Sequence, residues 1–241
     1  MLLPNERLDY LLKENLRIIQ NDDVFSFSTD ALLLGHFTTV RKHDRIMDLC
    51  SGNGVVALLL SNKGTQDIEA IEIQSQLVDM AQRSIAYNGL DSRIHMRHLD
   101  LRDVRRHYPP SQFSLVTCNP PYFKTNQRHQ HLKEAHKIAR HEVMCTLDDC
   151  CMATRHLLKE GGRFIMVHRA ERFMDVVETM RTYQLEPKKV HFVYSKPDRS
   201  AQTIVVEARK GGNQGLEIAP PFYIYDEAGA YTPEMSEIYY G

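Results

Sequence analysis

The sequence predicts an α/β protein built around one Rossmann-like, doubly wound and mostly parallel sheet. Strand-like and helix-like segments alternate along most of its 241 residues, an order typical of sheets with helical crossovers. Several strand-like segments are continuous apolar runs, as expected for strands that helices cover on both faces. A glycine-rich stretch directly follows the first of them, where open α/β sheets bind their ligands. The composition, 42% apolar and 25% charged, excludes disordered and fibrous classes.

Seven segments have the length and apolar character of strands. The last two are joined by a short connection that contains Pro197, which leaves no room for a crossover helix. We therefore expect a seven-stranded sheet whose last strand is antiparallel and forms an edge hairpin with the strand before it. The seven segments are residues 45–49, 68–73, 93–98, 113–118, 163–168, 190–194 and 203–208.

Helical patterns lie between these strands. Thr29 and Asp30 head an apolar run, and the pair Asn88-Gly89 supplies a left-handed stop for a second helix. Another helix is expected to begin directly after the glycine-rich stretch. The other expected helices are residues 29–37, 74–88, 147–158 and 170–183.

The chain is expected to form a single domain. Residues 1–43 are interpreted as an N-terminal extension with a helix, residues 44–210 as the core sheet, and residues 211–241 as an irregular tail packed on the domain. The longest apolar run, Val55 to Leu60, is far shorter than the roughly 18 residues of a membrane span. We therefore expect a cytoplasmic protein that does not enter a membrane.

The cysteines and charges suggest further expectations. Five cysteines in no spaced pairs indicate reduced thiols, and no Cys or His set has metal-ligand spacing, so no metal is expected. The formal net charge is only −1, yet five basic residues and four histidines against one acid lie between Lys124 and His141. Five arginines lie between Arg93 and His107. Such local basic stretches favour contact with the phosphates of a nucleic acid.

The first chemical motif is the stretch from Asp48 to Gly54. Glycines at this point allow a ligand to approach the backbone closely, and the helix that follows presents its N-terminus. Ser51, Gly52 and Gly54 are therefore expected to contact a cofactor. Taken alone, the glycines also fit a weak dinucleotide fingerprint. A carboxylate at Asp48 would repel a pyrophosphate, however, so we favour a cofactor with a cationic amino group and no phosphate.

Two more acids follow the next two strands. Glu72 stands at the end of the second strand, where an acid can accept hydrogen bonds from both ribose hydroxyls. Asp100 closes the third strand, and we expect it to bond an adenine amino group. Each acid alone would be read as a cap or a loop residue. Three acids at the carboxyl ends of three successive strands instead indicate one site for S-adenosyl-L-methionine.

The second motif is Asn119-Pro120-Pro121-Tyr122, directly after the fourth strand. Consecutive prolines make a stiff turn, and in a doubly wound sheet this turn faces the glycine loop. The Asn119 side-chain oxygen and the Pro120 carbonyl can accept the two N–H bonds of an exocyclic amine and hold its nitrogen in line with a sulfonium methyl group. Tyr122 offers a face on which an extruded base can stack.

With these motifs, the sequence resembles class I S-adenosylmethionine-dependent methyltransferases. It is most similar to the bacterial family that methylates N6 of the adenine 3′ to the anticodon in a valine tRNA. One departure is Cys50, where the wider superfamily commonly has glycine or alanine. The resemblance rests on DLCSGNG (48–54), IEIQ (71–74), LDLRD (99–103), NPPYF (119–123), Gln20 with FSFSTDALLLGHF (25–37), and PPFYIYDEAGAYTPEM (220–235).

The resemblance implies a function in tRNA processing and assigns the expected site. S-adenosyl-L-methionine is the expected cofactor, S-adenosyl-L-homocysteine the product, and an RNA, in particular tRNA, the expected partner. Asn119, Pro120 and Tyr122 are the expected catalytic residues. The expected cofactor-binding residues are Thr29, Asp30, Asp48, Ser51, Gly52, Gly54, Glu72, Ile73, Asp100, Leu101 and Asn119. The expected substrate-binding residues are Pro121, Tyr122, Phe123, Lys124 and Arg128.

The motif Asn-Pro-Pro-Tyr leaves other targets open. A release-factor glutamine amide and the N2 of guanine in rRNA are also planar nitrogens that such a motif serves. The basic stretch after Tyr122 favours RNA, because Lys124 and Arg128 could follow a phosphate backbone. A non-catalytic RNA-binding module with the same fold is a further alternative. The sequence does not indicate the oligomeric state.

Overall fold

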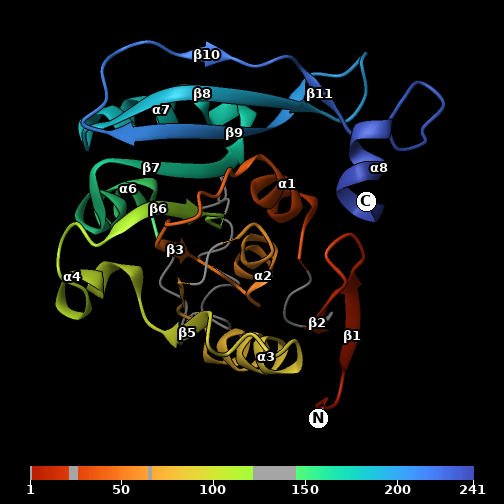
Figure 1. Ribbon diagram of the computed structural model, residues 1–241. Helices are drawn as coiled ribbons and strands as arrows, with labels where there is room; N and C mark the ends of the chain where they lie inside the picture. Colours follow the sequence, from red (N-terminus) through yellow and green to blue (C-terminus); the bar gives the residue numbers. More distant parts are fainter. Residues whose placement is uncertain (1, 22–26, 65–66, 122–144) are drawn as a thin grey trace, which may run out of the picture.

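The computed structural model describes residues 2–21, 27–64, 67–121 and 145–241 (Figure 1). Its main sheet contains seven long strands in the spatial order β5-β4-β3-β6-β7-β9-β8. All neighbours are parallel except β9, which runs antiparallel to both β7 and β8. The strands are β3 (Ile46–Leu49), β4 (Ile68–Glu72), β5 (Ile94–His98), β6 (Phe113–Cys118), β7 (Leu158–Arg169), β8 (Leu185–Tyr194) and β9 (Ala201–Lys210).

The seven-stranded, mostly parallel sheet with an antiparallel last strand confirms the predicted fold class. Two short strands, β10 (Glu217–Ile218) and β11 (Phe222–Tyr223), widen the sheet by pairing with the outer edge of β8. β7 begins before the expected residue 163, because it follows α6 directly and contains the pair Gly161-Gly162.

Helices cover both faces of the sheet, as Figure 1 shows. Alternate residues of the central strands enter two separate cores: in β6, Leu115 packs in the core under α1, α2 and α3, whereas Val116 packs in the core under α4, α6 and α7. This alternation explains the continuous apolar runs of the central strands. The helices are α1 (Thr29–Phe37), α2 (Val55–Ser61), α3 (Ser75–Tyr87), α4 (Val104–His107), α6 (Leu147–Leu157) and α7 (Phe173–Thr182).

The expected helices are confirmed to within a few residues at their ends. α3 ends as predicted, with Gly89 at a φ of 65°. α6 begins with a capping box in which the side chains of Thr146 and Asp149 each bond the other's backbone N–H. No helix in the described part of the chain is long and apolar enough to cross a membrane.

The N-terminal segment contains a β-hairpin, formed by β1 (Glu6–Leu11) and β2 (Leu16–Asn21). The sequence predicts no strand before residue 45, and this expectation is wrong. The hairpin lies against α3, where Ile19 is buried with Leu77 and Met80 and its N–H donates to Ser84 Oγ at 2.9 Å. Contacts with a helix more than 50 residues away therefore stabilise the hairpin, and a local reading of the sequence does not include them.

The C-terminal tail is more ordered than the irregular segment that the sequence suggests. Besides β10 and β11 it contains α8 (Pro233–Tyr240), whose first turn is capped by the Thr232 hydroxyl, which accepts a hydrogen bond from Met235 N–H. Met235 and Ile238 are buried in the core beside α1. The tail thus packs on the sheet's helical layer, and the stacked rings of Tyr231 and Tyr239 extend this packing.

Candidate functional site

A cavity of about 350 Å³ opens at the carboxyl ends of the central parallel strands. It lies at the point where β3 and β6 are neighbours and the chain continues outward in opposite directions, to β4 and to β7. Ligands of doubly wound sheets bind at this switch point, and the volume falls in the range of about 300–1,000 Å³ typical of small-molecule sites. The lining residues come from seven segments: Ser28, Asp30, Cys50, Ser51, Gly52, Val55, Val56, Ile71, Glu72, Ile73, Gln74, Leu77, Leu99, Asp100, Leu101, Asn119, Pro120, Pro121, Cys145 and Arg169.

The glycine loop between β3 and α2 forms the floor of this cavity. Its Ser51 N–H donates to the Ile71 carbonyl at 3.0 Å, which fixes the loop to the end of β4. Gly54 has a φ of 86°, and a Cβ added to it would lie 3.1 Å from the Ala81 Cβ. Gly54 does not line the cavity; it allows the loop to pack closely on α3.

Cys50, the departure from the superfamily pattern, has a φ of 55°. This left-handed conformation costs a non-glycine residue roughly 1 kcal/mol or more, which is why a glycine suits the position. The thiol side chain is accommodated, and Cys50 itself lines the cavity.

Asp48 lies behind the glycine loop and does not line the cavity. Its carboxylate accepts hydrogen bonds from Ser51 Oγ at 2.6 Å and from Thr117 Oγ1 at 2.7 Å, so it links the loop to β6. Only 1% of the residue is exposed. Burial raises the pKa of Asp48 to about 6, the two hydroxyl donors oppose this rise, and the charge of Glu72 adds to it. The structure thus places Asp48 next to the site without direct access to a ligand.

Glu72 does line the cavity, at the end of β4. One of its oxygens accepts the N–H of Gly52 at 3.0 Å and the other accepts the N–H of Gln74 at 3.0 Å. The side chain is therefore held rigidly at the wall of the cavity.

Asp100 and Asp30 complete an acidic wall around the cavity. Asp100 caps the short helix after β5 and pairs with Arg102, whose guanidinium holds the pKa of Asp100 below its ordinary value. Asp30 stands in the first turn of α1 and accepts a hydrogen bond from Thr203 Oγ1 at 3.0 Å. Thr29, next to it, is not among the lining residues. Three carboxylates against one cation, Arg169, make the lining suited to a positively charged ligand.

Asn119, Pro120 and Pro121 line the cavity directly after β6. Because β6 pairs with β3 in register, with Leu49 opposite Cys118, the turn faces the glycine loop as the sequence predicts. Ile73 and Leu101 also line the cavity. Tyr122, Phe123, Lys124 and Arg128 lie outside the described residues, so their expected roles stay predictions.

The sequence reading missed several lining residues. Arg169 ends β7, the strand beside β6, and its position at the carboxyl end of a parallel strand was the available signal. Cys145 precedes α6 and carries no such signal, because the chain brings it to the cavity from a distant segment. Val55 and Val56 of α2 and Leu77 of α3 add apolar side chains to the lining.

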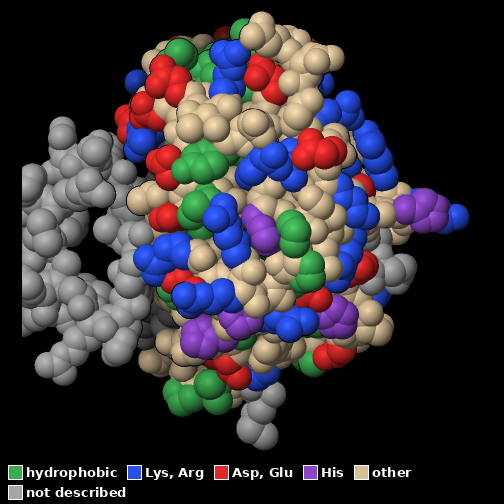
Figure 2. Space-filling model, turned by 90° about the vertical axis from the view of Figure 1, so that its left-hand side faces the viewer, with side chains coloured by type: hydrophobic (Ala, Val, Ile, Leu, Met, Phe, Trp, Pro, Cys, Tyr) green, Lys and Arg blue, Asp and Glu red, His purple; other side chains and the backbone are tan. Residues whose placement is uncertain are grey.

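The arginines between Arg93 and His107 are less available for contacts with nucleic-acid phosphates than the sequence suggests. Arg97 pairs with Glu69, Arg102 with Asp100, and Arg106 with Asp103. Figure 2 shows that on one face of the molecule Lys and Arg side chains lie among Asp, Glu and His side chains. This face therefore carries a mixed charge pattern and not a single positive field.

The strand order, the antiparallel β9 and a cavity at the switch point define a class I methyltransferase fold. Solved structures share this fold. A predicted O-methyltransferase from Agrobacterium tumefaciens superimposes with a TM-score of 0.70 at 18% identity, over 87% of this chain and 95% of that one. A geranyl diphosphate C-methyltransferase from Streptomyces coelicolor gives a TM-score of 0.54 at 12% identity, over 75% of this chain and 77% of that one.

Residues 15–192 match the family model described as "Methyltransferase small domain", and the chain belongs to this family. It is accordingly an S-adenosylmethionine-dependent methyltransferase. Two curated relatives carry the name tRNA1(Val) (adenine(37)-N6)-methyltransferase. The protein of Parabacteroides distasonis is 29% identical over 74% of each chain, and that of Photobacterium profundum is 25% identical over 86% of this chain and 87% of its own.

Proposed function

We propose that this protein transfers the methyl group of S-adenosyl-L-methionine to N6 of an adenine in RNA, and specifically in a tRNA. The observation that carries the proposal is the position of Asn119, Pro120 and Pro121 in the same cavity as the glycine loop and Glu72. A turn that can hold a planar amine thus borders the expected cofactor site. The relatives named as tRNA adenine-N6 methyltransferases support the choice of RNA and of adenine.

The lining suggests how the cofactor lies. Glu72, which lines the cavity at the end of β4, would accept the ribose hydroxyls, and Asp100 would accept the adenine amino group. Asp30 at the start of α1 would lie toward the methionine end, where the ammonium and sulfonium groups are positive. Asp48 would act through Ser51, which it positions, since it does not reach the cavity itself.

The reaction requires positioning more than proton abstraction. The lone pair of an adenine amino group is delocalised into the ring, and acceptors on both N–H bonds favour the rehybridised nitrogen. The Asn119 Oδ1 and the Pro120 carbonyl would supply these acceptors. The nitrogen then attacks the methyl carbon, the carbon–sulfur bond breaks to give neutral S-adenosyl-L-homocysteine, and the nitrogen loses one proton to solvent.

The RNA contacts of this proposal involve cations around the cavity mouth. Arg169 lines the cavity at the end of β7, and it would contact the RNA backbone that delivers a base to Asn119. Lys124 and Arg128 would extend this contact. Phosphate contacts of this kind make binding dependent on salt concentration.

The test is methyl transfer from deuterium-labelled S-adenosylmethionine to unmodified bulk tRNA, with nucleoside mass spectrometry as the readout. We expect labelled N6-methyladenosine as the product. Parallel reactions offer unmodified ribosomal RNA and a purified release factor as acceptors. The Asn119→Ala variant is the negative control for each acceptor.

The outcomes separate the alternatives. Labelled N2-methylguanosine in RNA would move the target to guanine, and a labelled glutamine in the release factor would move it to a protein amide. If cofactor binds and none of the three acceptors gains label, the proposed methylation of RNA is refuted.

A further inference from the structure

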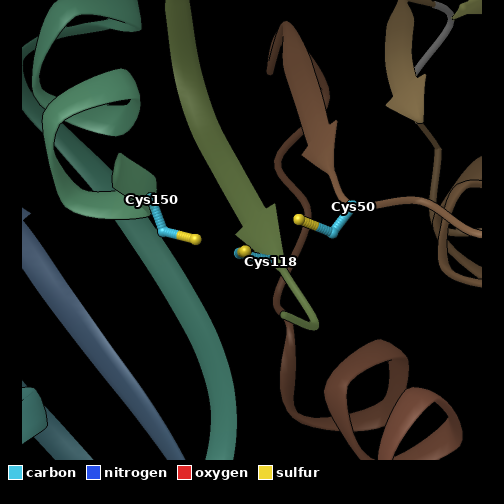
Figure 3. Close-up of side chains that lie close together, drawn as sticks. All are labelled: Cys50, Cys118 and Cys150. Carbon is cyan, nitrogen blue, oxygen red and sulfur yellow. The ribbon is translucent and has the colours of Figure 1, made fainter. Parts of the chain in front are cut away.

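Four of the five cysteines come together beside the cavity. The sulfur atoms of Cys50, Cys118 and Cys150 all lie within 4.8 Å of one another, and Figure 3 shows Cys50 and Cys150 pointing toward each other with the Cys118 sulfur between them. The Cys145 sulfur lies 3.7 Å from that of Cys50 and 3.9 Å from that of Cys150. These four side chains are called the thiol cluster below.

The thiol cluster is assembled by the fold from three segments. Cys50 follows β3, Cys118 ends β6, and Cys145 and Cys150 flank the start of α6. The first two are brought together because Leu49 pairs with Cys118 across β3 and β6. Metal sites recognised from sequence use ligand pairs a few residues apart, so the spacing gives no sign of this cluster.

We propose that the thiol cluster binds one zinc ion through four sulfur ligands. A tetrahedral site with zinc–sulfur bonds of about 2.3 Å places its sulfurs about 3.8 Å apart. The Cys145 sulfur lies 3.7 Å from that of Cys50 and 3.9 Å from that of Cys150, which matches this spacing. The sulfurs of Cys50, Cys118 and Cys150 lie within 4.8 Å of one another and need to close by up to about 1 Å, and the Cys145 sulfur must also approach that of Cys118. A ligand set made only of sulfur selects a soft or borderline ion over magnesium or calcium.

The surroundings of the thiol cluster suit an anionic metal centre. Cys118 and Cys150 are fully buried, which protects their bonds to a metal from water. Cys145 and Cys150 lie at the N-terminus of the eleven-residue helix α6, whose dipole favours negative charge. The Asp149 carboxylate lies at the same end of the helix and opposes this effect, although it is engaged in the capping box.

A bound ion would have a positioning role at this place. Cys118 directly precedes Asn119, and Cys50 directly precedes Ser51, so one metal would hold the Asn-Pro-Pro turn and the glycine loop at a fixed separation. It would also fix the start of α6 to both. The ion would be structural, since the amine and the methyl group need no metal to react.

The experiment uses the whole chain, purified under reducing conditions and stripped of metal with a chelator. Titration with zinc against a chromogenic chelator should give one ion per chain. Titration with cobalt should produce the sulfur-to-cobalt charge-transfer absorption and the intense visible bands of a tetrahedral thiolate site. Zinc should also raise the midpoint of thermal unfolding, because an ion that binds only the folded state stabilises it.

Variants test the assignment of ligands. Cys145→Ser and Cys150→Ser should each weaken zinc binding by roughly a hundredfold or more, because the affinity is shared among four bonds. The matched control is Cys151→Ser, a buried thiol on the same helix outside the cluster, which should retain the wild-type stoichiometry. If the buried variant Cys150→Ser fails to fold, Cys145→Ser still tests the ligand assignment, because Cys145 is only half-buried and lies before the helix.

The proposal is overturned if the stripped wild-type chain binds no stoichiometric zinc or cobalt under reducing conditions. It is also overturned if Cys151→Ser loses the ion as fully as Cys150→Ser does. A disulfide between Cys50 and Cys145, found by mass spectrometry in protein that is alkylated without prior reduction, would assign the short sulfur contact to redox chemistry instead. None of these outcomes depends on RNA methylation, because the readout is the metal itself.

Discussion

Asp48 shows how a single residue can be located correctly and still be given the wrong orientation. The sequence correctly predicts that Asp48 lies at the end of the first predicted strand and next to the glycine loop. Its carboxylate, however, turns away from the cavity to Ser51 and Thr117. Thr117 belongs to a strand almost 70 residues away. No local sequence pattern therefore reveals that its hydroxyl donates a hydrogen bond to the Asp48 carboxylate.

The buried Asp48 should make stability depend on pH in a specific window. Its pKa is raised to about 6 by burial, so the folded chain holds this proton more tightly than the unfolded chain does. The free energy of unfolding should therefore fall as pH rises from about 4 to about 6, by roughly 3 kcal/mol for this group. Urea unfolding across this range measures it, and Asp48→Asn should remove that part of the slope.

A surface aspartate provides the comparison for Asp48. Asp91 is exposed after α3, and Asp91→Asn should leave the pH dependence of unfolding as it is in the wild type. Equal slopes in the wild type and in Asp48→Asn would contradict the assignment of the raised pKa to Asp48.

Gly54 is the residue whose lack of a side chain matters most for the loop. In Gly54→Ala the new Cβ would lie 3.1 Å from the Ala81 Cβ, and the φ of 86° would be strained. We expect a loss of about 1–3 kcal/mol in the free energy of unfolding and weaker binding of S-adenosylhomocysteine, measured by calorimetry. Gly89→Ala has a positive φ and no atom within 4 Å of the added Cβ. It should lose some stability and bind the cofactor product normally.

At the scale of elements, the sequence predicts the central strands and the helices that cover them. The strands β3, β4, β6 and β7 carry enough apolar residues for burial on two faces, and that signal is local. The hairpin β1–β2 carries no such signal, because its burial depends on α3. α8 does carry one, since Thr232 followed by Pro233 is a helix cap with proline in the first turn, and the tail could have been predicted as helical on that basis.

The hairpin β1–β2 should depend on its ion pair with α3. Arg83 contacts both oxygens of Glu6, at 2.6 and 2.7 Å, and the Glu6 side chain is 2% exposed. Glu6→Gln should lower the free energy of unfolding by about 1–3 kcal/mol. Hydrogen exchange should show the loss of protection concentrated in β1 and β2.

Glu237→Gln is the matched control for the hairpin. It removes a second charged contact of the same hairpin, the 3.5 Å pair between Lys13 and the exposed Glu237 of α8. An exposed pair contributes roughly 0–1 kcal/mol. A Glu237→Gln effect as large as that of Glu6→Gln would contradict the view that the contact with α3 holds the hairpin.

At the scale of the whole molecule, the cavity arises from topology. Glu72, Asp100 and Asn119 end or follow three different strands, and the parallel sheet brings them to one edge, as the sequence predicts. The thiol cluster arises in the same way, yet the sequence gives no warning of it, because cysteines are also ordinary buried residues. The fold therefore determines which of the dispersed side chains become a site.

The cavity should bind the cofactor product strongly enough to stabilise the whole chain. At a hundredfold excess over its dissociation constant, S-adenosylhomocysteine adds about 2.7 kcal/mol to the free energy of unfolding. For a chain of this size that corresponds to a rise of roughly 5–10 °C in the thermal midpoint. Glu72→Gln should reduce the rise at the same ligand concentration, whereas Glu171→Gln, an exposed acid outside the lining, should keep it.

The most direct test of the account compares binding and transfer in Asn119→Ala under single-turnover conditions with unmodified tRNA. Asn119 is expected to hold the amine and is only one of many residues expected to contact the cofactor, so calorimetry should show little change in the binding of S-adenosylhomocysteine. The rate of methyl transfer should fall by about a hundredfold or more, while Asn213→Ala in an exposed loop should transfer at the wild-type rate. A variant Asn119→Ala that binds the cofactor product and methylates tRNA as fast as the wild type would contradict the account.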